Sequence, residues 1–556
     1  MFVRPAESLE KLLNERFTQE SGTMYPQCAF AAGNKFNVQG VLLVEQVVEQ
    51  IAKLQFLNHF WMTLFLIIPI VLISRTVVAG SRYSPILIIV LFGLGMGYAL
   101  VKSGIGTPGL PELPLVALIS RVTLVALAVS FFVGGQELKK IIKGEHLELD
   151  EIVVYSSEET LLGTRRTQLY FIIRAFFILI GIEGVLKLFT GSVDSDPIGH
   201  FYPLIAYVGL CGAIILIDNK ATIQNKGAYL RKGLFEILLI VGVLLLSGFI
   251  ASIVKPTIAL PQIFFAMLIS SGLGMLFSNW VMGPTGRSLL FAGIPVVLAA
   301  NFMIGGSRIV EAFKIQGMTS VMAYGFFGQV FWMFGGLALL IFLGNANNVR
   351  NLAPGMAGSL SHAGLTGACT AGDLGTEAAA RAPIMINVPF FGHIFVFTIL
   401  AMSVQQGKLM VPAAMIISTI GLILTAWSLK TLRKAGGKES EEVKGLMQFS
   451  FGWQLVAVFG GFFLLYLGGL DISNSAMAKS SAISHFGLFA ATQGGMFGET
   501  AASLIPFIFA MPFLVHPLVF GIFGAAMEKD GEMPRIPVLV LAVIGTLGVI
   551  YSLTMA

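Results

Sequence analysis

Charged residues and cysteines are both scarce in this 556-residue chain, and each shortage excludes a class of protein. Only 12% of the residues are charged, against roughly 25% in soluble domains. The 3 cysteines are too few and too scattered for a disulfide framework or a cysteine metal site. The patterns H-E-x-x-H, G-x-S-x-G and the phosphate loop are also missing, so we expect neither an enzyme, nor a cofactor, nor an ATP-driven pump.

Apolar residues are abundant, at 56% of the chain, and the mean hydropathy is +0.84. Apolar runs of about 20 residues, each able to cross a hydrocarbon core of about 30 Å as a helix, recur from residue 58 onwards. They predict an all-α, multi-pass integral membrane protein of the plasma membrane or the bacterial inner membrane, with the lipid bilayer as its partner. About fourteen spans are expected, at 58–80, 84–102, 113–134, 168–190, 200–217, 233–254, 259–281, 287–305, 318–344, 383–404, 409–429, 447–470, 504–527 and 536–555.

The net charge of +5 does not indicate a nucleic-acid partner. The Lys and Arg residues cluster in a few loops beside the spans, as they do in cytoplasmic loops of membrane proteins. The basic loops after the third, fifth and eleventh expected spans all fall on one side by span counting. We therefore expect that side to face the cytoplasm.

Four regions follow from this pattern. Residues 1–57 are a polar tail with an interfacial helix, and residues 58–232 form a first membrane half. Residues 233–430 form a second half, which contains a first polar segment (345–382). Residues 431–556 repeat a three-helix unit and contain a second polar segment (471–503).

The two polar segments are copies of one another. Without a gap, residues 361–397 and 484–520 share 15 identities over 37 positions, where chance would give about three. The similarity reaches back to Phe-Gly-Gly at 334–336 and at 459–461. A fainter pair matches GLGM at 93–96 with 272–275, and SFFVGGQELKK (130–140) with NFMIGGSRIVE (301–311).

Both pairs of copies are separated by an odd number of expected spans, so they should cross the membrane in opposite directions. Inverted repeats are typical of secondary transporters. Each polar segment is too rich in glycine and polar residues to be an ordinary span. Non-helical backbone is tolerated at membrane depth only where protein or a water-filled cavity satisfies it, so we expect two re-entrant segments that meet in a site reachable from either side.

Hydroxyl and carboxylate oxygens are ligands suited to Na⁺, and a carboxylate can instead carry a proton. We expect the cation or proton to couple at oxygen-bearing residues of the two segments: Asp373, Thr376, Glu377, Thr492, Glu499 and Thr500. We expect the solute to bind at these residues: His362, Gly364, Thr366, Thr370, Arg381, His485, Gly487 and Gln493. No metal other than Na⁺ is expected.

Other polar residues leave two interpretations open. Arg381 can neutralise a neighbouring carboxylate or meet a carboxylate of the solute. His393 and His516 recur in both copies, and they fit helix packing and a solute contact equally well. The amide of Gln329 is expected to make an interhelical hydrogen bond.

Several segments resemble a known family. From GLGMGYALVKSGIGTPGL (93–110) through SFFVGGQELKK, the first third resembles the opening half of sodium symporters and cation/proton antiporters built from inverted five-helix repeats. NFMIGGSRIVEAF (301–313), a long span, a glycine-rich segment with His-x-Gly, and PIMINVPFFGHIFVF (383–397) follow one another as in the second half of the glutamate:sodium symporter family.

The resemblance implies an elevator-like fold, in which a transport domain moves against a scaffold, and a homodimer or homotrimer. It also implies that the re-entrant segment with His362, Gly364, Thr366 and Thr370 helps to form the substrate and sodium site. The chain departs from the family because both polar segments follow residue 345, instead of one per half, and because it has about four more spans.

The sequence therefore predicts a secondary active transporter that moves a small, anionic solute coupled to Na⁺ or H⁺ by alternating access. The alternative with the same fold is a monovalent cation/proton antiporter, in which Asp373, Glu377 or Glu499 exchanges a proton for the cation. A membrane-embedded enzyme and an assembly protein are further alternatives.

Overall fold

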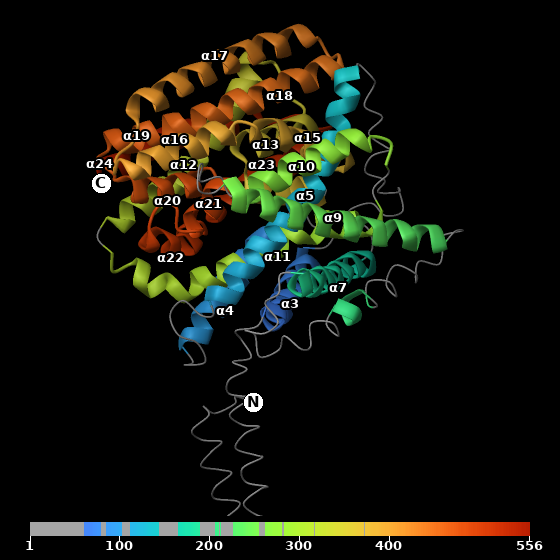
Figure 1. Cartoon of the computed structure of the whole chain (residues 1–556). Coiled ribbons are helices and arrows are strands. Elements are labelled where there is room, and N and C mark those ends of the chain that lie inside the picture. Colours follow the sequence, from blue (N-terminus) through green and yellow to red (C-terminus); the bar gives the residue numbers. More distant parts are fainter. Residues whose placement is uncertain are drawn as a thin grey trace, which may run out of the picture.

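A computed structural model gives the structure of this chain for residues 60–78, 85–102, 112–143, 165–189, 206–210, 212, 226–254, 262–280, 283–315, 317–371 and 373–555. Within these residues the fold is entirely helical (Figure 1). The earlier helices are α3 (Phe60–Val78), α4 (Ile86–Lys102), α5 (Glu112–Lys143), α7 (Arg165–Phe189), α9 (Lys226–Val254), α10 (Gln262–Leu276) and α11 (Pro284–Ala312).

The later helices include two short π-helices, η3 and η4, and one 3₁₀-helix, η5. In chain order they are α12 (Met318–Ala338), η3 (Leu339–Leu343), α13 (Val349–Leu360), α14 (Ala363–Ala371), α15 (Thr376–Phe390), α16 (His393–Gln405), α17 (Val411–Ala435), α18 (Glu439–Leu455), η4 (Val456–Gly460), α19 (Gly461–Leu467), α20 (Ile472–Ala482), α21 (Phe486–Gln493), α22 (Glu499–Ile508), η5 (Met511–Val515), α23 (His516–Glu528) and α24 (Arg535–Thr554).

Eight helices in the described part are long and apolar enough to cross a membrane, or nine when the bent pair α15 and α16 is one span. The chain is therefore a multi-pass membrane protein. A helix, continuous or broken, lies at each of the other thirteen expected spans, and in 200–217 only residues 206–210 and 212 are described, all of them helical. Residues 1–57, with the expected interfacial helix, lie outside the described residues.

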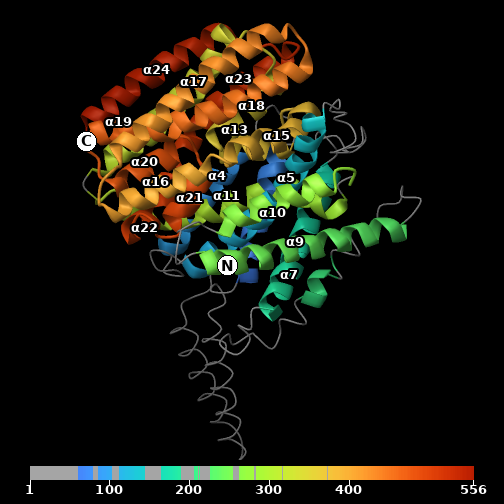
Figure 2. The ribbon, with the colours of Figure 1, turned by 45° about the horizontal axis from the view of Figure 1, so that its top comes forward.

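The C-terminal helices α17, α18 and α24 gather on one side of the molecule and α7 and α9 on the other, with α11 between them (Figures 1 and 2). The span in α11 is buried along its whole length, and α11 packs against α4, α5, α7 and α22. Peripheral helices instead leave apolar side chains exposed, such as Ile423 on α17 and Leu547 on α24. In a membrane these faces meet lipid chains.

Glycines bring α4 onto α11 and α10 onto α5 in equivalent ways. A Cβ on Gly97 would overlap the backbone of Met303, and a Cβ on Gly274 would overlap the backbone of Phe132. Met303 and Phe132 occupy the same place in the matched segments 301–311 and 130–140. Gly97 is therefore the structural counterpart of Gly274, whereas the GLGM match aligned Gly95 with it. The packing of these helices therefore supports the faint repeat, with its register shifted by two residues relative to the GLGM sequence match.

Candidate functional site

Both polar segments break their helices at a Ser-His pair. The first breaks between α13 and α14, and the second between α20 and α21. Ser361 has a φ of 46° and Ser484 a φ of 48°, in the left-handed region that costs a non-glycine residue about 1–2 kcal/mol. The amides of His362 and His485 then each donate a hydrogen bond to the carbonyl five residues earlier, at 2.9 Å in both cases. The sequence duplication is thus repeated in the backbone geometry.

The two breaks pair directly with each other. The Ala363 amide donates to the Ser484 carbonyl at 2.9 Å, and the Phe486 amide donates to the Ser361 carbonyl at 3.1 Å. These bonds form a short antiparallel bridge, which we call the crossing. The crossing gives partners to backbone groups that leave their helices in the interior of the protein, where no group can remain unpaired without cost.

Each break is capped by its own histidine. The Leu365 amide donates to His362 Nδ1 and the Leu488 amide donates to His485 Nδ1, both at 3.0 Å. A ring nitrogen that accepts a hydrogen bond carries no proton, so in the neutral ring the proton is on Nε2. Both capping histidines therefore direct an Nε2–H donor away from their own helix.

Each of these donors meets a histidine from the other copy. His485 Nε2 lies 3.1 Å from His393 Nε2, and His362 Nε2 lies 3.3 Å from His516 Nε2. His393 Nδ1 lies 3.0 Å from the Phe390 carbonyl, so it is the donor there and His393 Nε2 is the acceptor. All four rings are buried. The sequence left the role of His393 and His516 open, and the structure pairs both with the crossing.

The two sides of this cluster differ in one respect. On one side, three hydrogen bonds run without interruption from the Leu488 amide through two rings to the Phe390 carbonyl. On the other side, His516 Nδ1 has no hydrogen-bond partner in the described part of the chain. With all four rings neutral, every ring nitrogen therefore has a hydrogen-bond partner on the side of His485 and His393 only.

Two glutamines complete the crossing from neighbouring helices. Gln329 on α12 contacts His362 and accepts a hydrogen bond from the Ser484 hydroxyl at 3.2 Å. Gln454 on α18 lies 3.3 Å from His485 Nε2 and donates to the Ser361 hydroxyl at 2.8 Å. Gln329 makes the interhelical bond expected of it. Gln454 escaped the sequence analysis, although it holds the same place relative to Phe459-Gly460-Gly461 that Gln329 holds relative to its own Phe-Gly-Gly.

The His-x-Gly motif has a steric reason in both copies. A Cβ on Gly364 would overlap the His516 ring, and a Cβ on Gly487 would lie 3.0 Å from His393 Nε2. Glycine therefore allows the histidine of one copy to lie directly on the broken helix of the other.

A small cavity of about 20 Å³ lies beside the crossing, which is room for roughly one water molecule. Ser361, Thr366 and His393 line it, together with apolar side chains of α5 and α10. At the positions equivalent to Thr366 and Ile386, the other copy has Phe489 and Phe509, whose ring centroids lie 4.5 Å apart. Small side chains thus make room on one side, and two aromatic rings take the matching positions on the other.

The acidic residues lie away from this cavity. Asp373 forms an ion pair with Arg75 of α3 at 2.7 Å, and Glu377 pairs with Arg350 at 3.0 Å. Arg381 Nη1 lies 3.9 Å from the Glu377 carboxylate, so Arg381 also meets a carboxylate of the chain. The pair with Arg75 joins the first polar segment to α3, and the other two lie within that segment.

The remaining expected residues fall into two groups. The hydroxyl of Thr370 donates to the Thr366 carbonyl at 2.9 Å and that of Thr492 to the Leu488 carbonyl at 2.7 Å, inside their own helices. Glu499 and Thr500 are exposed at the start of α22, and Gln493 is partly exposed at the end of α21. Thr376 is at the start of α15, and its side chain is outside the described set. Among the described residues no group of three or more His, Cys, Asp and Glu side chains is arranged for a metal.

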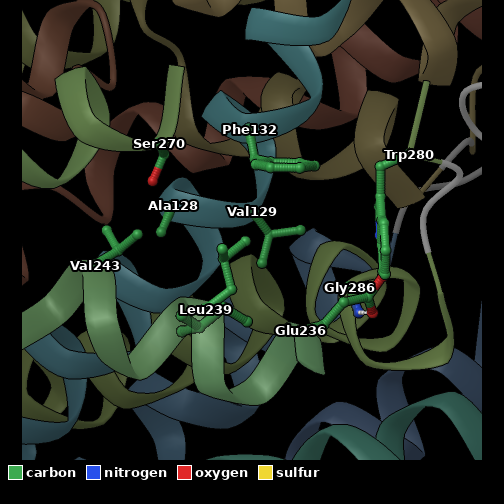
Figure 3. A pocket seen from close by; sticks show the side chains of 10 residues that line it. Ala128, Val129, Phe132, Glu236, Leu239, Val243, Ser270, Trp280 and Gly286 are labelled. Atoms are coloured by element: carbon green, nitrogen blue, oxygen red, sulfur yellow. Dashed lines mark hydrogen bonds between the residues drawn. The ribbon is translucent and has the colours of Figure 1, made fainter. Parts of the chain in front are cut away.

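A second cavity of about 30 Å³ lies away from the crossing, among α5, α9 and α10 (Figure 3). Its lining is mainly apolar, with the Glu236 carboxylate at one edge. That carboxylate accepts hydrogen bonds from Trp280 Nε1 at 3.1 Å and from the amides of Gly283 and Gly286 at the start of α11. Glu236 therefore caps α11, a structural role that favours negative charge at a helix N-terminus.

Lys479 on α20 is the most unusual residue that the sequence analysis missed. Its side chain is completely buried, and its Nζ lies 3.9 Å from the centroid of the Trp332 ring. A lysine among the small residues of a polar segment was the signal available in the sequence.

Comparisons with protein-family models, curated proteins and solved structures give no match for this chain.

Proposed function

We propose that this chain is a secondary active transporter that moves a small, anionic solute, coupled to Na⁺ or H⁺, by alternating access around the crossing. The observation that carries the proposal is the antiparallel pairing of two equivalent helix breaks, through the Ala363 and Phe486 amides. Broken helices that meet inside a membrane protein are the usual binding elements of secondary transporters. The membrane in which it acts is the plasma membrane or the bacterial inner membrane.

The arrangement of the two copies supports an inverted repeat. Equivalent segments run antiparallel where they meet, as two copies related by a two-fold axis in the membrane plane must do. The bend of 43° between α15 and α16 supports a re-entrant or broken segment in the first copy. Fourteen spans and an elevator-like movement of one part against the other are the topology that we propose on this basis.

The cavity beside Ser361, Thr366 and His393 marks the side on which we propose that the solute binds. It is closed to about one water molecule in this arrangement, as expected of an occluded state. The helices α14 and α21 begin at the crossing, and helix N-termini favour an anionic ligand.

The acidic residues make the cation/proton antiporter the weaker alternative. Asp373 and Glu377, which would exchange the proton for a cation, are engaged by arginines. Glu499 is exposed at the surface of α22. Between the two coupling ions, the buried rings at the crossing favour a proton, because nitrogen bases bind a proton and Na⁺ prefers oxygen.

The test is solute uptake by the purified chain in proteoliposomes. Labelled succinate, citrate, L-aspartate and L-glutamate are offered under an imposed Na⁺ gradient and, separately, under an imposed pH gradient. We expect one of these anions to accumulate above its outside concentration and to leave when an ionophore collapses the gradient. If none accumulates under either gradient, the transporter proposal is wrong.

A matched pair of variants tests the position of the solute. Thr366→Val removes one hydroxyl from the cavity without changing its shape, and we expect it to raise the KM for uptake about tenfold, the loss of one hydrogen bond to an anion. Thr419→Val makes the same change on the exposed face of α17, where the hydroxyl donates to the Met415 carbonyl. An equal effect of both variants would contradict a solute at the cavity.

A further inference from the structure

Lys479 has a buried amine that forms no hydrogen bond with the described residues of the crossing. The side chain is fully buried in α20, and its Nζ has no hydrogen-bond partner in the described part of the chain. Nζ lies over the face of the Trp332 ring, 3.9 Å from its centroid. A buried ammonium without a carboxylate is one of the most costly groups in a protein.

The other copy shows what the fold itself requires at this position. Met356 precedes Ser361 by five residues, just as Lys479 precedes Ser484. A Cβ on Gly336 would lie 2.7 Å from the Met356 methyl group, and a Cβ on Gly461 would overlap the Lys479 side chain. The two side chains thus fill equivalent niches, each against the glycine of its own Phe-Gly-Gly. An unbranched apolar side chain is sufficient for packing, so the amine serves another purpose.

The surroundings of Lys479 favour the uncharged amine. A cation–π contact with Trp332 recovers only part of the cost of removing an ammonium from water. Charge on Lys479 would also repel charge on His485.

Among the described residues, the elements packed against α20 offer no buried carboxylate to balance an ammonium. They contribute the buried phenol of Tyr324 from α12, the exposed Tyr466 from α19 and the exposed Glu499 at the start of α22. None of these pairs with Lys479 in the described part of the chain.

We propose that Lys479 carries the coupling proton of this transporter. In the closed arrangement without solute it is a neutral amine. When α20 and its niche open to water on one side, the nitrogen lone pair takes a proton from a hydronium ion, which becomes water, and the ammonium passes through the cycle with the solute. When the niche opens to the other side, that N–H bond breaks and a water molecule there takes the proton. This step rests on the proposed function, and it identifies the coupling ion as H⁺.

The first experiment needs no solute. The purified full-length chain and Lys479→Met are unfolded reversibly by SDS in mixed micelles between pH 7 and pH 9. If the amine is neutral in the folded chain and charged in the unfolded chain, unfolding takes up one proton, so the wild-type protein gains stability as the pH rises. We expect the unfolding equilibrium constant to fall tenfold more per pH unit in the wild type than in Lys479→Met.

Two controls make the result specific. Lys529→Met removes an exposed lysine, and its pH dependence should equal that of the wild type. Lys479→Arg keeps a charge that cannot be lost, so it should be less stable than Lys479→Met at pH 7. Equal pH slopes for the wild type and Lys479→Met would overturn the proposal, because Lys479 would then be charged in the folded chain.

The second experiment measures coupling, in proteoliposomes with trapped pyranine and the four anions named above. We expect an inward proton movement with the transported anion in the wild type, and anion movement without protons in Lys479→Met. Unchanged proton movement in the variant, or wild-type transport without protons, would overturn the proton-carrier role and leave the transporter standing. If no anion moves, the proposed function fails, while the unfolding experiment still reports the charge of Lys479.

Discussion

The two glycines at the crossing make a quantitative prediction, because their surroundings differ. A Cβ at residue 364 would overlap His516, whose ring lies between Phe513, at a centroid distance of 4.3 Å, and Phe520, at 5.4 Å. That ring cannot turn aside without moving an aromatic neighbour. Overpacking of this kind costs about 1–3 kcal/mol, and the helix propensity of alanine returns at most about 1 kcal/mol.

Gly364→Ala should therefore destabilise the protein by about 1–2 kcal/mol, or roughly a 5- to 30-fold increase in the unfolding equilibrium constant. Gly487→Ala should change stability by less than about 1 kcal/mol, because its Cβ meets His393 Nε2 only at 3.0 Å. Gly95→Ala on α4, where a Cβ would find no atom within 4 Å, is the control and should be neutral or stabilising.

The assay is reversible unfolding in mixed micelles for these variants and for the double variant Gly364→Ala with His516→Ala. Removal of the ring makes room for the methyl group, so the two changes should cost less together than the sum of their separate costs, by at least about 0.5 kcal/mol. A Gly364→Ala protein as stable as the wild type, or strict additivity in the double variant, would refute the contact between the two copies.

Three further predictions concern the surrounding structure. Glu236→Gln leaves the start of α11 without its charged cap. It should lower the unfolding free energy by about 1–2 kcal/mol, measured as a lower Tm. An unchanged Tm would contradict the capping role. Asp373→Asn removes the carboxylate that pairs with the buried Arg75. A double-mutant cycle with Arg75→Gln should give a coupling energy above about 0.5 kcal/mol, and zero coupling would disprove the pair. Replacing choline by Na⁺ at constant ionic strength should not raise the Tm if a proton is the coupling ion, whereas a saturable rise that Thr366→Val abolishes would indicate Na⁺ in the cavity.

The sequence was sufficient to predict the helices and the meeting of the two polar segments. Apolar runs of the length of a membrane crossing leave little choice but helix, and the repeated Ser-His-x-Gly indicated that the same backbone break occurs twice. The pairing of His393 with His485 could not be predicted, because it joins residues 92 positions apart from different copies. Only the packing of the two copies determines which histidine faces which.

The acidic residues show a limit of sequence reasoning. Asp373 and Glu377 were expected to couple the transport because carboxylate oxygens suit Na⁺ or a proton. The structure pairs Asp373 with Arg75, 298 positions away, and Glu377 with Arg350 of the same polar segment. An ion pair between distant segments leaves no periodic signal, so the sequence cannot distinguish an anchoring carboxylate from one that binds a cation.

In the transport cycle that we propose, the histidine pairs between the copies limit how one copy can move relative to the other. His362 reaches His516 of the second copy, and His485 reaches His393 of the first, so a relative shift of the copies disturbs both pairs together. If the copies were identical, the conformations open to the two sides would have equal energy. In the proposed cycle, the differences between the copies decide which conformation is favoured: a cavity at Thr366 against a ring at Phe489, and methionine against lysine in the two niches. Protonation of Lys479 would change the energy of its own niche and not that of the Met356 niche. A ligand shifts a two-state equilibrium only through unequal affinity for the two states. Protonation of one niche is therefore the kind of bias that a coupling ion must supply.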